Sequence, residues 1–217
     1  MLGNLSRVLE EIGWRKHDCH EGLPRDGEYH GLKWGAGAIS LEESIFLSGL
    51  IWVTRPDVVI ELGTANGASA CVIGATLKDM GSGQFTTVDL RAIPSPPAVA
   101  LAREHELQIQ WVTETNSLVF LERYEVDPEK RYFIFSDTDI PIRPIEVRGV
   151  LSKFPLGTVI AVHDTADKHP LGPMHLKSQI DEPCVELPSP RGITVLVKTQ
   201  ETVRERLPRK SAKSEER

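Results

Sequence analysis

The sequence has few of the cysteines that define secreted or zinc-stabilised proteins. Only three occur among its 217 residues, Cys19, Cys71 and Cys184. An odd, sparse and widely spaced set provides neither a disulfide framework nor a paired zinc motif. We therefore expect a reducing compartment and a cytoplasmic protein.

Long hydrophobic runs are also missing. The most apolar stretch, residues 45–53, is too short to cross a bilayer. The N-terminus mixes Arg7, Glu10 and Glu11 into its apolar residues, so it lacks the hydrophobic core of a secretion signal. These features predict that the protein is neither secreted nor inserted into a membrane.

Positive charge is scarce as well. The chain has 25 Lys and Arg against 31 Asp and Glu, which gives a formal net charge of −6. Proteins that bind a phosphate backbone by bulk electrostatics usually have the opposite balance, so we expect no nucleic-acid partner. What is present, 40% hydrophobic and 26% charged residues, suffices for one soluble globular domain.

The chain divides into three parts. Residues 1–39 contain a short amphipathic helix followed by a Gly-, His- and Asp-rich run, and we expect this segment to cover the substrate. Residues 40–200 form the main domain. Residues 201–217 have almost no apolar side chains and predict a charged, disordered tail.

Strand-like and helix-like segments alternate through the main domain. Strands are expected at 57–62, 85–90, 108–112, 132–136, 158–163, 185–187 and 193–197, and helices at 41–53, 68–80, 98–106, 117–124 and 145–154. This order predicts an α/β fold with a doubly wound, mostly parallel sheet and an antiparallel pair at one edge. Ligands of such sheets bind at the carboxyl ends of the strands.

A glycine-framed turn follows the first of these strands. Gly63 and Gly67 have G-x-x-x-G spacing, which is neither the G-x-G-x-x-G of a dinucleotide site nor a P-loop with its lysine. Asp89, after the second strand, is placed to accept hydrogen bonds from ribose hydroxyls. The alternative for the glycines is a plain strand-to-helix turn.

These segments resemble the class I S-adenosylmethionine-dependent methyltransferases, in particular the small O-methyltransferases and their metal-dependent, cephalosporin-hydroxylase-like relatives. The similarity runs from about residue 39 to 197 and rests on VVIELGTANGASA, FTTVDL, YFIFSDTD, GTVIAVHDT and RGITVLVK. It implies a Rossmann-like, seven-stranded sheet whose last strand is antiparallel. Ala65 replaces the middle glycine of the family's E-x-G-x-G-x-G pattern.

The resemblance also implies cofactor contacts. Asp89 would hold the ribose of S-adenosylmethionine, and Asn116 and Ser117 would lie near the adenine or, alternatively, cap a helix. The methionine part would be lined by Glu61, Gly63, Thr64, Gly67 and Ser69.

Acidic residues and a histidine follow the fourth and fifth strands. Asp137 and Asp139 follow one, and His163 and Asp164 the other, so these side chains should converge. Three interpretations remain open. In the first, Asp137, His163 and Asp164 hold a divalent metal such as Mg, Mn or Fe, which lowers the pKa of an acceptor hydroxyl. In the second, His163 is a general base that works without a metal. In the third, the aspartates cap turns and His163 is an interior residue.

We expect methyl transfer to an oxygen of a small molecule, with Asp137, His163 and Asp164 as catalytic residues. The alternatives are an NAD(P)-dependent oxidoreductase and a non-catalytic protein that keeps the cofactor pocket for regulation or assembly. A homodimer is a family-level expectation.

Two further clusters are weaker. The first invites a zinc interpretation but matches no standard spacing; it comprises His17, Cys19, His20 and His30. The second lies in the loop after the fifth strand, an expected lid or surface loop, and comprises Asp167, Lys168, His169, His175 and Lys177.

Overall fold

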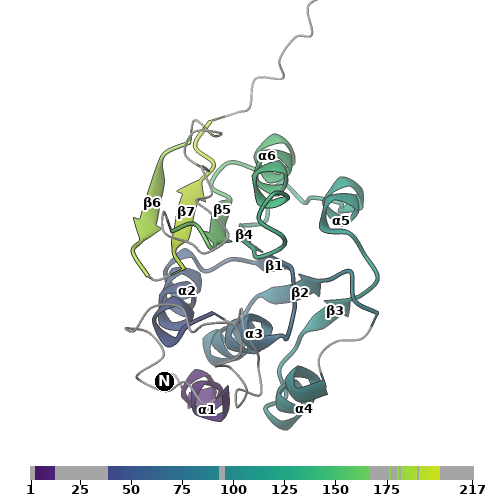
Figure 1. The fold of residues 1–217 in the computed structure, drawn as a ribbon, viewed down its shortest axis with the longest axis vertical. Coiled ribbons are helices and arrows are strands. Elements are labelled where there is room, and N and C mark those ends of the chain that lie inside the picture. The colour runs from purple at the N-terminus through teal and green to yellow at the C-terminus, as the bar shows by residue number, and fades with distance from the viewer. Residues whose placement is uncertain are drawn as a thin grey trace, which may run out of the picture.

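A seven-stranded sheet forms the centre of the structure, a computed structural model that describes residues 3–12, 39–92, 96–166, 176, 180, 182–189 and 191–200 (Figure 1). Its strands are β1 (Val58–Leu62), β2 (Gln84–Val88), β3 (Gln110–Val112), β4 (Tyr132–Ser136), β5 (Val159–His163), β6 (Cys184–Leu187) and β7 (Ile193–Val197). Their order is β3-β2-β1-β4-β5-β7-β6. β1 to β5 are parallel, and β7 is antiparallel to both of its neighbours. The predicted fold class is confirmed.

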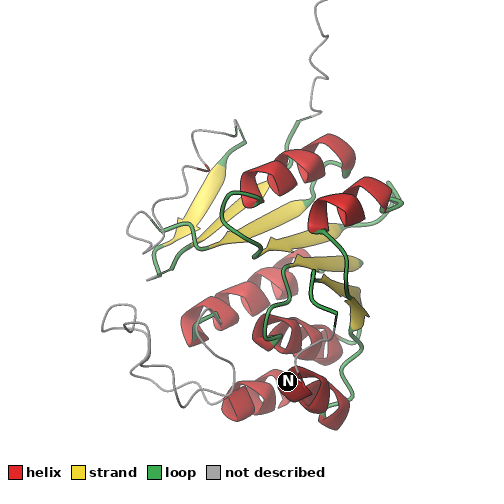
Figure 2. Cartoon of the chain, turned by 45° about the vertical axis from the view of Figure 1, so that its right-hand side comes forward, coloured by secondary structure: helices red, strands yellow, loops and turns green. Residues whose placement is uncertain are grey.

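Helices cover both faces of the sheet (Figure 2). They are α1 (Gly3–Ile12), α2 (Leu41–Thr54), α3 (Ala68–Met80), α4 (Pro96–Glu104), α5 (Ser117–Arg123) and α6 (Arg143–Lys153). α5 and α6 pack on one face, and α2 and α3 pack on the other. This three-layer arrangement follows from the alternation of strands and helices along the chain.

The pleat of β1 shows how the two cores form. Val58, Ile60 and Leu62 belong to the core under α5 and α6, whereas Val59 belongs to the core under α2 and α3. All five residues of β1 are buried, because helices cover both faces of a parallel strand. The strand therefore begins with three consecutive apolar residues rather than an alternating pattern, and its one polar residue, Glu61, is buried as well.

Local signals fixed several helix ends. A capping box begins α2: the Ser40 hydroxyl accepts a hydrogen bond from the Glu43 amide at 3.2 Å, and Oε2 of Glu43 accepts one from the Ser40 amide at 2.7 Å. The prediction for α6 was wrong by two residues. The helix begins at Arg143, not at 145, because Pro144 occupies its first turn, where the missing N–H group has no helical partner to lose.

The amphipathic helix α1 packs against α3 and α4 through Leu5, Val8 and Ile12. Asp79 of α3 accepts hydrogen bonds from the backbone amides of Asn4 and Leu5 at 3.0 and 2.9 Å. This helix therefore belongs to the core of the domain. Residues 13–38 and 201–217, with most of the expected substrate-covering segment and the charged tail, lie outside the described residues. In the part of the chain that the structure describes, no helix is long and apolar enough to span a membrane.

The turn between β1 and α3 requires its glycines for packing within the chain. Gly63 and Gly67 have φ values of +94° and +79°. A Cβ at Gly63 would lie 2.4 Å from the carbonyl oxygen of Asp137, and one at Gly67 would lie 2.5 Å from Cβ of Ala98. The turn is therefore pressed against the end of β4 on one side and α4 on the other.

This packing predicts that Gly67→Ala destabilises the protein more than Gly157→Ala. Gly157 has nearly the same φ, +80°, but a Cβ there would meet nothing within 4 Å. Both variants should lose about 1–2 kcal/mol for the left-handed backbone, and Gly67→Ala should lose a further 1–3 kcal/mol or so for overpacking. Urea unfolding of both variants measures the difference. Equal losses would contradict the proposed steric cause.

Candidate active site

A cleft of about 420 Å³ opens at the carboxyl ends of β1, β2 and β4. β1 and β4 are the neighbours at which the strand order reverses, the place where open α/β sheets bind their ligands. Six predicted site residues line the cleft: Gly63, Asp89, Asn116, Ser117, Asp137 and Asp164. Its volume lies within the usual range of small-molecule sites.

Asp89 is held in a fixed orientation at the end of β2. Its Oδ2 accepts a hydrogen bond from the Ala65 amide at 2.7 Å, and its Oδ1 accepts one from the Arg91 amide at 2.9 Å. An ionised carboxylate has about four acceptor positions, so each oxygen can still accept a hydrogen bond from a ligand. The first of these bonds also holds Ala65 at a φ of +46°, where the family pattern has glycine.

Four predicted cofactor residues do not line the cleft: Glu61, Thr64, Gly67 and Ser69. Glu61 is fully buried, and its Oε2 accepts a hydrogen bond from Thr87 Oγ1 at 2.5 Å. Burial raises the pKa of Glu61 to about 8. Its Oε1 has no hydrogen-bond partner among the described residues. Glu61 therefore lies beneath the glycine turn rather than on its ligand side.

Asn116 and Ser117 both have structural partners. The side chain of Asn116 accepts a hydrogen bond from the Leu118 amide at 2.9 Å and caps α5. Ser117 is buried, and its side chain opposes the rise in the pKa of Glu146 that burial causes. The capping alternative for Asn116 is thus observed, and both residues still line the cleft.

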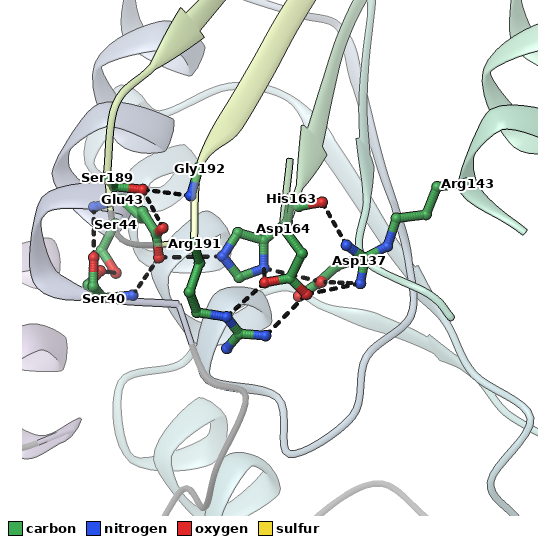
Figure 3. A network of polar contacts seen from close by, with 10 residues as sticks. All are labelled: Ser40, Glu43, Ser44, Asp137, Arg143, His163, Asp164, Ser189, Arg191 and Gly192. Atoms are coloured by element: carbon green, nitrogen blue, oxygen red, sulfur yellow. Dashed lines mark hydrogen bonds and ion pairs between the residues drawn. The ribbon is translucent and has the colours of Figure 1, made fainter. Parts of the chain in front are cut away.

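The three predicted catalytic residues come together at the ends of β4 and β5. Asp137, His163 and Asp164 each offer a ligand atom, and these atoms lie within 4.8 Å of one another. Nδ1 of His163 lies 3.0 Å from Oδ1 of Asp137, and Nε2 lies 3.1 Å from Oε2 of Glu43 (Figure 3). Both ring nitrogens are therefore occupied, by carboxylates from opposite sides.

Two carboxylates keep the imidazole charged. Burial by itself disfavours the charged form of His163, but Asp137 and Glu43 outweigh that cost and raise its pKa to about 10. Burial likewise opposes ionisation of Glu43, but His163 and Ser189 lower its pKa to about 2. The general-base interpretation of His163 does not fit this structure, because the ring is fully buried, protonated near neutral pH and without a free nitrogen.

Two arginines complete the network. Nη2 of Arg143 lies 3.0 Å from Oδ1 of Asp137 and 3.0 Å from Oδ2 of Asp164. Arg191 binds both oxygens of Asp164, with Nε 2.5 Å from Oδ1 and Nη2 2.9 Å from Oδ2. Burial favours the neutral form of Asp164, but His163, Arg191 and Arg143 lower its pKa.

Sequence reasoning missed three members of this network. Glu43 is the fourth residue of the capping box, and only that role has a sequence signal. Arg191 lies in the RGITVLVK segment, but nothing in the segment marks its partner. Arg143 opens α6 without any motif. All three depend on contacts that only the folded chain makes.

The residues at this site do not fit a divalent metal ion. Asp137 and Asp164 are close enough to share one, but their oxygens already bind two guanidinium groups and an imidazole. Guanidinium groups stay charged at every physiological pH, so a dication would meet positive charge rather than free lone pairs. Oδ2 of Asp137 is the exception among these oxygens. It has no hydrogen-bond partner among the described residues, and Asp137 lines the cleft.

The two weaker clusters lie outside the described residues. They are the residues of the zinc interpretation and those of the expected lid, residues 167–177 with the exception of Leu176. Cys71 is buried in α3, and Cys184 lies in β6 with intermediate exposure.

Neither protein-family models nor characterised protein sequences match the chain. Comparison of folds does find similar structures. An O-methyltransferase from Bacillus cereus in complex with SAH has a TM-score of 0.61 at 19% identity, covering 90% of this chain and 91% of that one.

Two further structures have the same fold. The O-methyltransferase TomG from Streptomyces achromogenes, in complex with SAM, gives a TM-score of 0.60 at 16% identity and covers 92% and 89% of the two chains. A methyltransferase from Geobacter sulfurreducens gives 0.63 at 11% identity and covers 90% and 88%. The chain therefore has the fold of these methyltransferases.

The buried imidazole predicts a loss of stability at alkaline pH. Below pH 6.5, His163 is protonated in both the folded and unfolded chains, and its contribution is fully present. Above that pH the unfolded chain releases the proton, whereas the folded protein holds it until about pH 10. The free energy of unfolding should therefore fall across this window. Urea unfolding at successive pH values measures it.

Glu43→Gln should reduce that pH dependence, because it removes one of the two carboxylates that raise the pKa of His163. The matched control is Glu122→Gln, which removes an exposed carboxylate on α5 and should keep the wild-type slope. A wild-type slope in Glu43→Gln would contradict the assignment.

Proposed function

We propose that the chain is an S-adenosylmethionine-dependent methyltransferase that acts on an oxygen of a small molecule. The observation that carries this proposal is the cleft at the β1–β4 reversal, with Asp89 held at the end of β2 and Asn116 at its rim. The similar folds crystallised with SAM or SAH support the cofactor, and those named O-methyltransferases support oxygen as the acceptor atom.

The residues present fit the adenosine part of this cofactor. Asp89 has an open acceptor position on each oxygen, which suits the two hydroxyls of a ribose. Gly63 and Ala65 place backbone rather than bulky side chains along the cleft. When bound, S-adenosylmethionine supplies a methyl group on a positively charged sulfur, which an oxygen nucleophile can take.

Asp137 is the residue that would accept the proton of the acceptor hydroxyl. Arg143 and His163 bind its Oδ1 and fix the orientation of the carboxylate. Its Oδ2 then remains for a ligand in the cleft. A general base contributes about 10²- to 10⁴-fold to a reaction rate when it is well placed. His163 and Asp164 act here as positioning residues, because their polar atoms are engaged within the network.

Binding of S-adenosylhomocysteine is the first test. Calorimetric titration of the full chain should give one site per chain, and Asp89→Asn should weaken it by about 10- to 100-fold, since a hydrogen bond to a charged group contributes about 1.5–3 kcal/mol. Conversion of S-adenosylmethionine to S-adenosylhomocysteine with a panel of phenols and alcohols then tests the reaction.

Asp57→Asn is the matched control. Asp57 also accepts a backbone hydrogen bond, from the Arg131 amide at 2.9 Å, but it lies at the amino end of β1, opposite the cleft. Its substitution should leave the affinity unchanged. No binding of S-adenosylhomocysteine to the wild type would refute the proposal, and binding without turnover would favour the non-catalytic alternative.

A further inference from the structure

We infer that Arg143 takes the place of a divalent metal ion between Asp137 and Asp164, so that this site works with a built-in organic cation. Metal-dependent relatives, by the resemblance, hold their ion with an acid after the fourth strand and acids after the fifth. Here a single guanidinium nitrogen lies 3.0 Å from an oxygen of each corresponding carboxylate. It bridges the same two groups that a metal would bridge.

Arg143 is fixed in that position by its other nitrogens. Nε donates a hydrogen bond to the Thr138 carbonyl at 2.7 Å, and Nη1 donates one to the His163 carbonyl. Its side chain is only 4% exposed. The arginine therefore joins the backbone that follows β4 to the end of β5, while its remaining nitrogen donates hydrogen bonds to both carboxylates. A cation that displaced it would also break these two backbone contacts.

The other oxygen of Asp164, Oδ1, is occupied as well. Arg191 binds Oδ1 and Oδ2 in the two-pronged geometry that guanidinium and carboxylate groups favour. Asp164 has a φ of +57°, and the backbone after it is held to the loop before β7, because the Ala166 amide donates to the Arg191 carbonyl at 2.9 Å. Two carboxylates thus match two permanent cations without any metal.

A metal ion would have to share this space. Magnesium and similar ions bind oxygen at about 2.1 Å and need close to six donors in octahedral geometry. An ion on Oδ1 of Asp137 would lie no more than about 5 Å from Nη2 of Arg143, with like charges facing across a buried region. Oδ1 of Asp137 and both oxygens of Asp164 already bind guanidinium or imidazole nitrogens, so Oδ2 of Asp137 is the one oxygen of this pair that a metal would find without such a partner among the described residues.

This arrangement restricts the kind of acceptor molecule that the site suits, an argument that rests on the proposed function. A bound divalent ion would favour acceptors with two neighbouring oxygens, because such ions take several oxygen ligands. With Arg143 in its place, Oδ2 of Asp137 is the hydrogen-bond acceptor that the network leaves to the cleft. An acceptor with a single hydroxyl meets that requirement, and a catechol-like pair has no advantage.

The inference is tested by metal binding to the full chain, independently of activity. Chelator-treated wild-type protein is titrated with MnCl₂, and free Mn²⁺ is followed by electron paramagnetic resonance. We expect no stoichiometric uptake at this site. One Mn²⁺ bound per chain, lost in Asp137→Asn and kept in Asp139→Asn, would overturn the inference. Asp139 is the matched control, since it also lines the cleft but is exposed and outside the network.

Arg143→Ala provides the converse measurement. Provided that its circular dichroism spectrum is native, the variant should take up Mn²⁺ through the released carboxylates, and the double variant Arg143→Ala/Asp137→Asn should lose that uptake. A folded Arg143→Ala chain that binds no Mn²⁺ counts against the arginine as the excluding group. If Arg143→Ala does not fold, the wild-type titration still decides.

These experiments distinguish a failure of the proposed function from a failure of this inference. A wild-type chain that excludes Mn²⁺ but does not bind S-adenosylhomocysteine leaves the inference intact and refutes the methyltransferase. Where turnover is detected, it should be unchanged by EDTA, and methylation of a monohydroxyl acceptor should match that of its vicinal diol within a few-fold. Loss of turnover with EDTA and its recovery with Mg²⁺ would overturn the inference.

Discussion

Pairing of buried charge at the ends of β4 and β5 is the constraint on which the site depends. Isolated ions in a protein interior are strongly unfavourable, and removing one partner of a buried pair is costly. The network satisfies this requirement with three acidic and three basic side chains. The acids are Glu43, Asp137 and Asp164, and the bases are His163, Arg143 and Arg191.

The network also joins elements that are distant in the sequence. Glu43 comes from α2, and its Oε1 accepts a hydrogen bond from Ser189 at 2.5 Å, in the loop between β6 and β7. Arg143 comes from α6, and His163 ends β5. One set of charges therefore fixes both helical layers against the edge of the sheet that holds the cleft. Preorganised side chains of this kind are what a site needs to orient a reacting group.

The cofactor side of the cleft is fixed by a different constraint, close contact between backbones. Gly63 lies against the Asp137 carbonyl, so the turn after β1 sets the position of the residue that starts the acidic cluster. The Ala65 amide in turn binds Asp89. The glycines of this motif therefore serve the packing of the fold, and their spacing alone does not distinguish that role from ligand binding.

Much of the fold could be predicted because its signals are local. Mainly apolar runs mark β1, β4 and β5, and Ser40 and Gly81 mark the ends of helices. The strand order places Asp89, Asp137 and Asp164 at one edge of the sheet. These signals depend on residues a few positions apart. The predicted start of α6 was two residues late, because Pro144 lies within the first turn of the helix and not before it.

The sequence by itself determined the class of sheet, the turn after β1 and the gathering of acids with His163 at two neighbouring strand ends. Only the tertiary structure decided what those acids bind. Glu43 meets His163 across 120 residues, and Arg191 meets Asp164 across 27. Such pairings leave no periodic trace in the sequence, because charge is satisfied by proximity in space. That proximity placed Arg143 between the two aspartates.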